Sequence, residues 1–222
     1  MIYEDFIKEL YQNEDLKYKE FHSRIIKSNN LIGVRTDKLK KIAKKIKDYQ
    51  YFIKNNKHSI YEETMVHGFM IGNLKENPSI ELLKFIKYID NWAICDLTVS
   101  NLKWFKKNKK EGLITIDKLI KNDDRWSKRV GYTLLLNYYI EEDYLNLIFN
   151  YAEESNTHEY YVLMAIAWLL STTFIKYPQE TKDYLNRSKM DKFTYNKTLQ
   201  KIIESTRTSE ETKKELRCLK RI

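Results

Sequence analysis

The scarcity of glycine and proline constrains the fold of this chain more than any other feature of its sequence. Only 5 Gly and 2 Pro occur among 222 residues, whereas soluble proteins contain on average roughly 7% Gly and 5% Pro. These two residues supply many of the tight turns that β-sandwiches and β-barrels require. The sequence therefore predicts an all-α fold.

Apolar residues recur at helical spacing along the chain. Between residues 34 and 47, apolar side chains return every three or four positions, and lysines fill most of the positions between them. This pattern is typical of an amphipathic helix with a basic outer face. Read in the same way, the whole chain predicts helices near residues 2–12, 14–27, 36–48, 50–56, 60–75, 79–89, 91–107, 114–122, 125–140, 142–154, 158–176, 179–187, 191–205 and 209–220.

Capping signals mark several of the expected helix starts. Ser59 precedes Glu62 by three residues, and Thr208 precedes Glu211 by the same distance, which is the spacing of a capping box. Asp90 precedes another expected helix, and an aspartate is a favoured N-cap residue.

Helices of this length, joined by short connections, pack as antiparallel pairs, and stacked pairs form an α-solenoid. No strict internal period is visible, so any repeats are degenerate, as in HEAT-like arrays with a period of roughly 40–47 residues. We predict one HEAT-like domain over residues 1–222, with a concave basic surface.

The charge balance favours a polyanionic partner. Lys and Arg outnumber Asp and Glu by 40 to 31, which gives a formal charge of +9 and predicts attraction to nucleic acid first and to a membrane surface second. The N-terminus lacks the pattern of a secretory signal, and no apolar run of ~18 residues follows. We therefore expect a cytoplasmic protein outside the membrane. Cys95 and Cys218 lack the paired spacing of a zinc site, so we expect no metal.

The segment DNWAICD at 90–96 places an acid and a tryptophan one helical turn apart. Residues at i and i+4 lie on the same face of a helix, so Trp92 and Asp96 are candidates for a shared site. The alternative is structural: Trp92 packs partly in the core, and Asp96 caps a helix or pairs with a base.

Two further segments carry candidate residues. Arg129 lies one turn after Trp126 and beside Lys128, and an arginine at such a place suits bidentate contact with a phosphate; the alternative is a surface ion pair with a neighbouring aspartate. Trp168 lies seven residues after Tyr161 in an apolar helix, so the two share a face. An aromatic stripe of this kind is also typical of a protein core.

These segments, in their order and spacing, resemble the AlkD-type DNA alkylation repair proteins, which are HEAT-like repeat DNA glycosylases that remove positively charged N3- and N7-alkylated purines. The resemblance covers nearly the whole chain. It is carried by GVRTDKLKKIAKKIK at 33–47, YEETMVHGFMIGNLK at 61–75, NWAICDL at 91–97, WSKRVGYTLLL at 126–136, AIAWLL at 165–170 and YNKTLQKIIESTRTS at 195–209.

The resemblance implies a role for individual residues. Asp96 matches the catalytic aspartate, and Trp92 and Trp168 match the two tryptophans of the site. Contacts with double-stranded DNA that contains alkylated purines are implied for Arg129, Lys128, Arg35 and Thr36. The resemblance further implies that the protein works without a pocket for a flipped base. We also expect a monomer that needs no cofactor.

The chain also departs from the family pattern. Many members carry an acid where this chain has Ala93, and a Lys and an Arg where it has Met164 and Ser171. Two other functions therefore stay open at this point. One is a non-catalytic HEAT-like protein that recognises bent, branched or damaged DNA, and the other is a protein-interaction scaffold.

Overall fold

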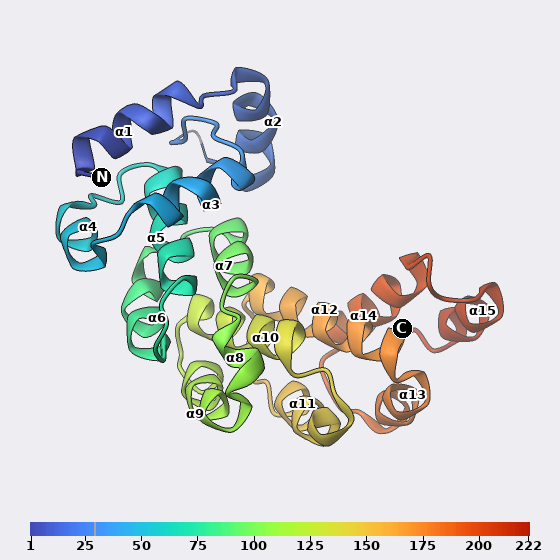
Figure 1. The fold of residues 1–222 in the computed structure, drawn as a ribbon. Coiled ribbons are helices and arrows are strands. Elements are labelled where there is room, and N and C mark those ends of the chain that lie inside the picture. Colours follow the sequence, from blue (N-terminus) through green and yellow to red (C-terminus); the bar gives the residue numbers. More distant parts are fainter. Residues whose placement is uncertain (29) are drawn as a thin grey trace. The chain divides into compact units, whose positions relative to one another are not determined.

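The computed structural model describes residues 1–28 and 30–222, and every regular element among them is a helix (Figure 1). The prediction of an all-α fold is confirmed. None of the described helices is long and apolar enough to cross a membrane. The helices are α1 (Tyr3–Gln12), α2 (Leu16–Ile26), α3 (Thr36–Lys45), α4 (Tyr49–Asn55), α5 (Tyr61–Gly72), α6 (Ser79–Phe85), η1 (Ile86–Tyr88), α7 (Trp92–Val99), α8 (Trp104–Lys107), α9 (Lys109–Ile120), α10 (Arg125–Tyr138), η2 (Glu142–Tyr144), α11 (Leu145–Glu153), α12 (Tyr160–Lys176), α13 (Pro178–Arg187), α14 (Lys192–Glu204) and α15 (Glu210–Cys218).

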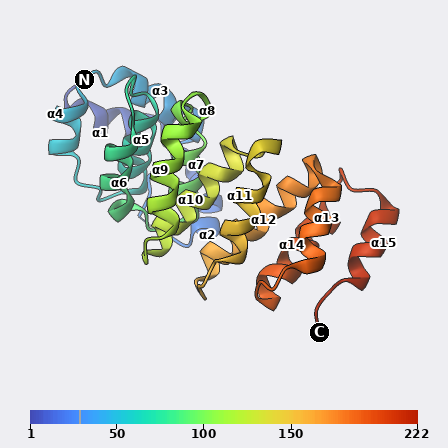
Figure 2. The same ribbon diagram turned by 90° about the horizontal axis from the view of Figure 1, so that it is seen from below.

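The chain divides into an N-terminal unit, Met1–Lys107, and a C-terminal unit, Asn108–Ile222. In the N-terminal unit, α5 is the central helix: its residues Tyr61–Ile71 are all buried, and it packs against α3 and α7. In the C-terminal unit, α12 has the same place between α10 and α14 (Figure 2). A row of packed helices within each unit agrees with a repeat architecture, but the HEAT-like solenoid and the single domain stay predictions.

Two glycines allow α5 and α7 to approach closely. A Cβ atom on Gly68 would lie 2.1 Å from Oγ1 of Thr98, and one on Gly72 would lie 2.2 Å from Nδ2 of Asn101. The same Nδ2 donates a hydrogen bond to the carbonyl of Phe69 at 3.2 Å. Only glycine leaves room at these two positions, because any side chain would overlap with Thr98 of α7 or with Asn101 in the turn after it.

Most expected helices differ from the observed ones by up to three residues at an end, and two differ by more. The expected helix at 91–107 is broken into α7 and α8, because the chain turns at Ser100 and Asn101. The hydroxyl of Ser100 donates a hydrogen bond to the carbonyl of Leu97, and the side chain of Asn101 donates one to the backbone of α5. The helix expected at 114–122 begins earlier, at Lys109, and includes Gly112 as a buried position.

The expected capping signals are each displaced by one residue. Glu63, not Glu62, accepts hydrogen bonds from the backbone N–H groups of Ser59 and Ile60. Asn91, not Asp90, caps α7, and Ser209 rather than Thr208 caps α15. At each of these helix starts a second polar residue stands beside the expected one, and the structure uses that neighbour.

Candidate functional site

The first part of the candidate site is the N-terminal half of α7. Asn91 caps this helix by accepting hydrogen bonds from the backbone N–H groups of Ala93 at 3.0 Å and Ile94 at 3.1 Å. Helical geometry then brings Trp92 and Asp96 to the same face, one turn apart. Both side chains are half-buried, whereas the residues between them are buried. A carboxylate and an indole ring thus share a partly exposed face.

The close packing of α7 on α5 fixes the position of this face. Thr98, one half-turn beyond Asp96, is fully buried against Gly68. A helix that is locked at such a contact cannot slide or rotate without overlap, because protein interiors are close-packed. Asp96 and Trp92 are therefore carried on a rigid element.

A buried carboxylate organises the segment before α3. Glu62 is fully buried, and it accepts three backbone hydrogen bonds, from the N–H groups of Ile32 at 2.9 Å, Gly33 at 2.7 Å and Val34 at 3.1 Å. Sequence reasoning assigned Glu62 to a helix cap and missed this role. The bonds hold the chain that leads directly into Arg35.

Arg35 itself is held by two neighbours. Its Nε and Nη2 atoms lie 2.9 Å and 2.8 Å from Oδ2 of Asp15, and its guanidinium carbon lies 5.2 Å from the centre of the Tyr18 ring. The backbone N–H of Tyr18 and the Arg35 side chain both lower the pKa of Asp15, so the carboxylate is charged at neutral pH. Thr36, half-buried, begins α3. Arg35 is exposed and oriented, as contact with a phosphate would require.

The second part of the candidate site surrounds Trp168 on α12. This tryptophan is 38% exposed on a helix that is otherwise mostly buried. It lines a pocket of about 290 Å³, together with two basic residues, Lys201 and Arg207. Burial lowers the pKa of Lys201, and the positive charges of Lys197 and Arg129 lower it further, while Glu204 opposes this.

Sequence reasoning missed Lys201 and Arg207. Both lie in the segment YNKTLQKIIESTRTS, which was noted only for its resemblance. Their contribution to a pocket beside Trp168 depends on the packing of α14 against α12. The local pattern of that segment does not contain this information.

Arg129 is more deeply buried than either sequence interpretation requires, since a phosphate contact and a surface ion pair both need an exposed side chain. Only 6% of its surface is exposed. Its Nη1 atom donates to the carbonyl of Tyr161 at 2.6 Å, and its guanidinium carbon lies 6.0 Å from the centre of the Tyr161 ring. The Tyr161 ring stacks on Trp126, with the ring centres 5.1 Å apart. Arg129 thus joins α10 to α12, and Lys128 is the more accessible cation of the two.

The candidate residues therefore form two groups. Trp92 and Asp96 lie together in the N-terminal unit, and Trp168 lies with Lys201 in the C-terminal unit. The resemblance assigns both groups to one site, and that assignment stays a prediction.

The fold and these groups define a class of protein, namely an all-helical protein that presents carboxylate, indole and cationic side chains on partly exposed helix faces. The family model described as DNA alkylation repair enzyme matches residues 6–202, and the chain belongs to this family. A comparison with curated proteins gives no match. Membership of the family supports a role in DNA repair with DNA as the partner.

Proposed function

We propose that this protein is a DNA glycosylase that hydrolyses the N-glycosidic bond of N3- and N7-alkylated purines in duplex DNA. One observation carries the proposal: in a member of the DNA alkylation repair family, Asp96 lies one turn from Trp92 on a partly exposed face of a rigidly packed helix. The alkylated purine is cationic, so the site needs to stabilise positive charge and does not need a strong acid.

The reaction breaks the bond between the anomeric carbon of the deoxyribose and the purine nitrogen. The bonding electron pair leaves with the base and neutralises its positive charge, while the sugar passes through an oxocarbenium-like state. Water then adds to the anomeric carbon and loses a proton, which leaves an abasic site. The carboxylate of Asp96 would stabilise the positive charge on the sugar and orient the attacking water.

The aromatic and basic residues would hold the DNA around this carboxylate. An indole ring attracts a cation over its face with a free energy of roughly 0.5–2 kcal/mol, which suits Trp92 and Trp168 to the cationic lesion or its sugar. Lys128 and Arg35 would bind backbone phosphates, as phosphate contacts position a duplex without reading its sequence. Arg129 would act chiefly by holding Tyr161 and α12 in place.

The substitution Asp96→Asn tests the chemistry. The amide keeps the size of the side chain and removes its charge, so we expect base release from DNA that contains N7-methylguanine or N3-methyladenine to slow by about 10²–10³-fold. Binding should change little or strengthen, because a negative charge near phosphates is lost. The measurement is single-turnover release of free base, corrected for release from DNA incubated without protein. If Asp96→Asn releases base as fast as the parent, Asp96 has a structural role and not a catalytic one.

Two buried positions at which the chain departs from the family pattern favour a second candidate function, that of a non-catalytic DNA-binding protein. Ala93 is only 1% exposed, so no group at this position supplements the charge of Asp96 at the surface. Ser171 is buried, and its hydroxyl donates to the carbonyl of Trp168 at 3.0 Å. If the parent binds duplex DNA but releases no base above background, this second function replaces the first.

A further inference from the structure

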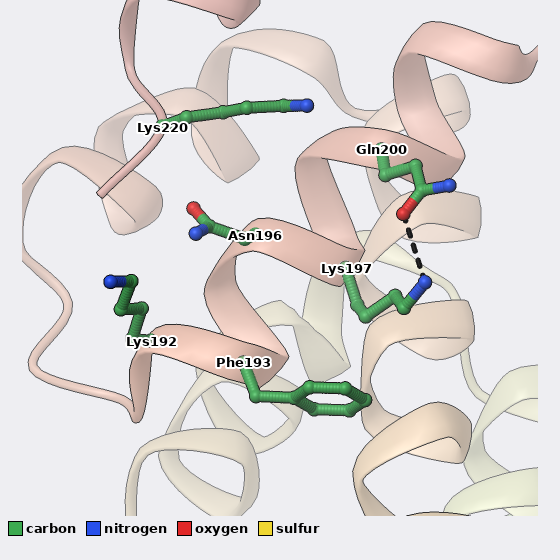
Figure 3. Close-up of a pocket in the computed structure, with 6 residues that line it drawn as sticks. All are labelled: Lys192, Phe193, Asn196, Lys197, Gln200 and Lys220. Atoms are coloured by element: carbon green, nitrogen blue, oxygen red, sulfur yellow. Dashed lines mark hydrogen bonds between the residues drawn. The ribbon is translucent and has the colours of Figure 1, made fainter. Parts of the chain in front are cut away.

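An open basic pocket lies on the C-terminal unit, and none of the site residues predicted from the sequence line it. Its volume is about 490 Å³, and it is formed by one side of α14 and by the chain that follows α15 (Figure 3). No carboxylate among the described residues lines it. The lining residues are Lys192, Phe193, Asn196, Lys197, Gln200 and Lys220.

The last residues of the chain are fastened to α14, and this builds one wall of the pocket. The side chain of Asn196 pairs with both backbone groups of Arg221: its Nδ2 donates to the carbonyl at 2.9 Å, and its Oδ1 accepts from the N–H at 3.0 Å. The guanidinium of Arg221 lies 3.7 Å from the centre of the Tyr195 ring and donates to the carbonyls of Ser188 and Met190. Lys220 is thereby held at the pocket.

The three lysines of the pocket keep their positive charge available. The Nζ atom of Lys197 donates to the neutral side chain of Gln200 at 2.9 Å (Figure 3). Gln200 in turn donates to Glu204 at 2.7 Å. The side chain of Gln200 therefore lies between the ammonium group of Lys197 and the carboxylate of Glu204 in this chain of bonds. Lys192 and Lys220 lie in no ion pair among the described residues. The pocket thus favours a ligand with several negative charges.

An exposed aromatic pair adjoins the lysines. Phe193 is 39% exposed and lines the pocket, and Tyr160, 55% exposed at the start of α12, lies with its ring centre 6.0 Å away. Exposed aromatic rings beside cations are the combination that binds single-stranded nucleic acid, because the lysines bind phosphates and the rings stack on unpaired bases. Bases inside a duplex are already stacked and cannot reach such a ring.

We propose that this pocket is a binding site for single-stranded DNA, in which the lysines contact successive phosphates and Phe193 stacks on an unpaired base. The proposed site shares no lining residue with the pocket beside Trp168, and it would let the protein hold an unpaired or displaced strand. It does not rest on the glycosylase proposal. An acidic peptide or a simple polyanion would use the lysines but not the aromatic ring, which gives the test its readout.

The first experiment measures binding of the full chain to oligo-dT of about 12 nucleotides, a length within the usual range for one such site. The comparison ligand is an abasic oligomer of the same length, which keeps the phosphates and lacks the bases. We expect the abasic oligomer to bind about tenfold more weakly, because stacking of a base contributes a free energy of that order. Phe193→Ala should abolish the difference, and Phe193→Tyr should retain it.

The second experiment tests the phosphate contacts through Lys192→Gln/Lys220→Gln. Loss of two contacts should reduce the slope of log affinity against log salt by about 1.4, since each phosphate contributes about 0.7 for a single strand. The matched control is Lys118→Gln/Lys214→Gln, which removes the same charge from exposed positions outside the pocket. The control should keep the parent slope. An equal fall in both variants would show that only net charge matters and would overturn the proposal.

Failure of this inference can be told apart from failure of the proposed function. Asp96→Asn should bind oligo-dT as well as the parent does, whatever its effect on base release. If the parent binds oligo-dT, the abasic oligomer and heparin equally well, the pocket is an unspecific polyanion surface and the inference is wrong. That result would leave base release from duplex DNA untouched.

Discussion

At the scale of single residues, a partly buried chain of hydrogen bonds links helices α4, α5 and α6 of the N-terminal unit with the segment before α5. Tyr49 donates to Glu81 at 3.1 Å, and its oxygen lies 3.1 Å from Nε2 of His67. Nδ1 of His67 lies 3.3 Å from Nε2 of His58, whose Nδ1 lies 3.3 Å from the hydroxyl of Thr64. One set of neutral tautomers satisfies every bond, with each ring donating through Nε2 and accepting at Nδ1.

The lowered pKa values of the two histidines predict that the folded chain loses stability in acid. Burial and the charge of Lys87 lower the pKa of His58 to about 4, and burial and His58 lower the pKa of His67 to about 3. The unfolded chain takes up these protons near pH 6.5 and the folded chain does not, so protonation favours unfolding. We expect full stabilisation above about pH 6.5, and for each histidine a loss on the order of 3 kcal/mol as the pH falls to about 4.

Urea unfolding of the parent and of His67→Gln at a series of pH values checks this expectation. Carboxyl groups titrate in the same range in both proteins, so the difference between the two profiles isolates the histidine. The variant should show the flatter profile between about pH 6.5 and 4. Parallel profiles would contradict the assignment of a neutral, buried His67.

At the scale of elements, the contact between α5 and α7 decides where Asp96 lies. Gly68→Ala would place a Cβ atom 2.1 Å from Oγ1 of Thr98, and overpacking of this kind costs about 1–3 kcal/mol. We expect lower thermal stability together with slower base release, because α7 must move. Gly131→Ala is the matched control: its Cβ would lie 2.6 Å from Cγ1 of Ile120, in the contact between α9 and α10 of the other unit.

A second substitution tests whether the contact between Gly68 and Thr98 accounts for both expected losses. The buried hydroxyl of Thr98 has no hydrogen-bond partner among the described residues, so its removal costs little in polar contacts. Gly68→Ala/Thr98→Ala should therefore recover both stability and base release relative to Gly68→Ala alone. If the double variant recovers stability but not base release, the position of α7 is not what limits the reaction.

At the scale of the whole molecule, the proposed function requires both units to contact one duplex. Arg35 in the N-terminal unit and Lys128 in the C-terminal unit are the test positions. Each phosphate contact contributes about 0.9 to the slope of log affinity against log salt for duplex DNA. Arg35→Gln and Lys128→Gln should each lower the slope by about 0.9, and the double variant by about 1.8. If the substitution in one unit leaves this slope unchanged, the duplex contacts only the other unit.

The sequence by itself determined the properties that depend on near neighbours along the chain. The scarcity of Gly and Pro and the helical spacing of apolar residues predicted an all-α fold. The spacing of Trp92 and Asp96 predicted their shared helix face, since a separation of four residues defines a face in any helix. Both inferences succeeded because backbone periodicity is a local property of the chain.

Only the tertiary structure decided which side chains are buried and what they contact. It buried Arg129 against Tyr161, assigned Glu62 to three backbone N–H groups about thirty positions earlier, and brought Lys201 beside Trp168. It also broke the helix expected at 91–107, because Asn101 binds the backbone of α5. Each of these outcomes depends on partners distant in the sequence, and the free energy of burying a polar group is set by those partners, not by its neighbours along the chain.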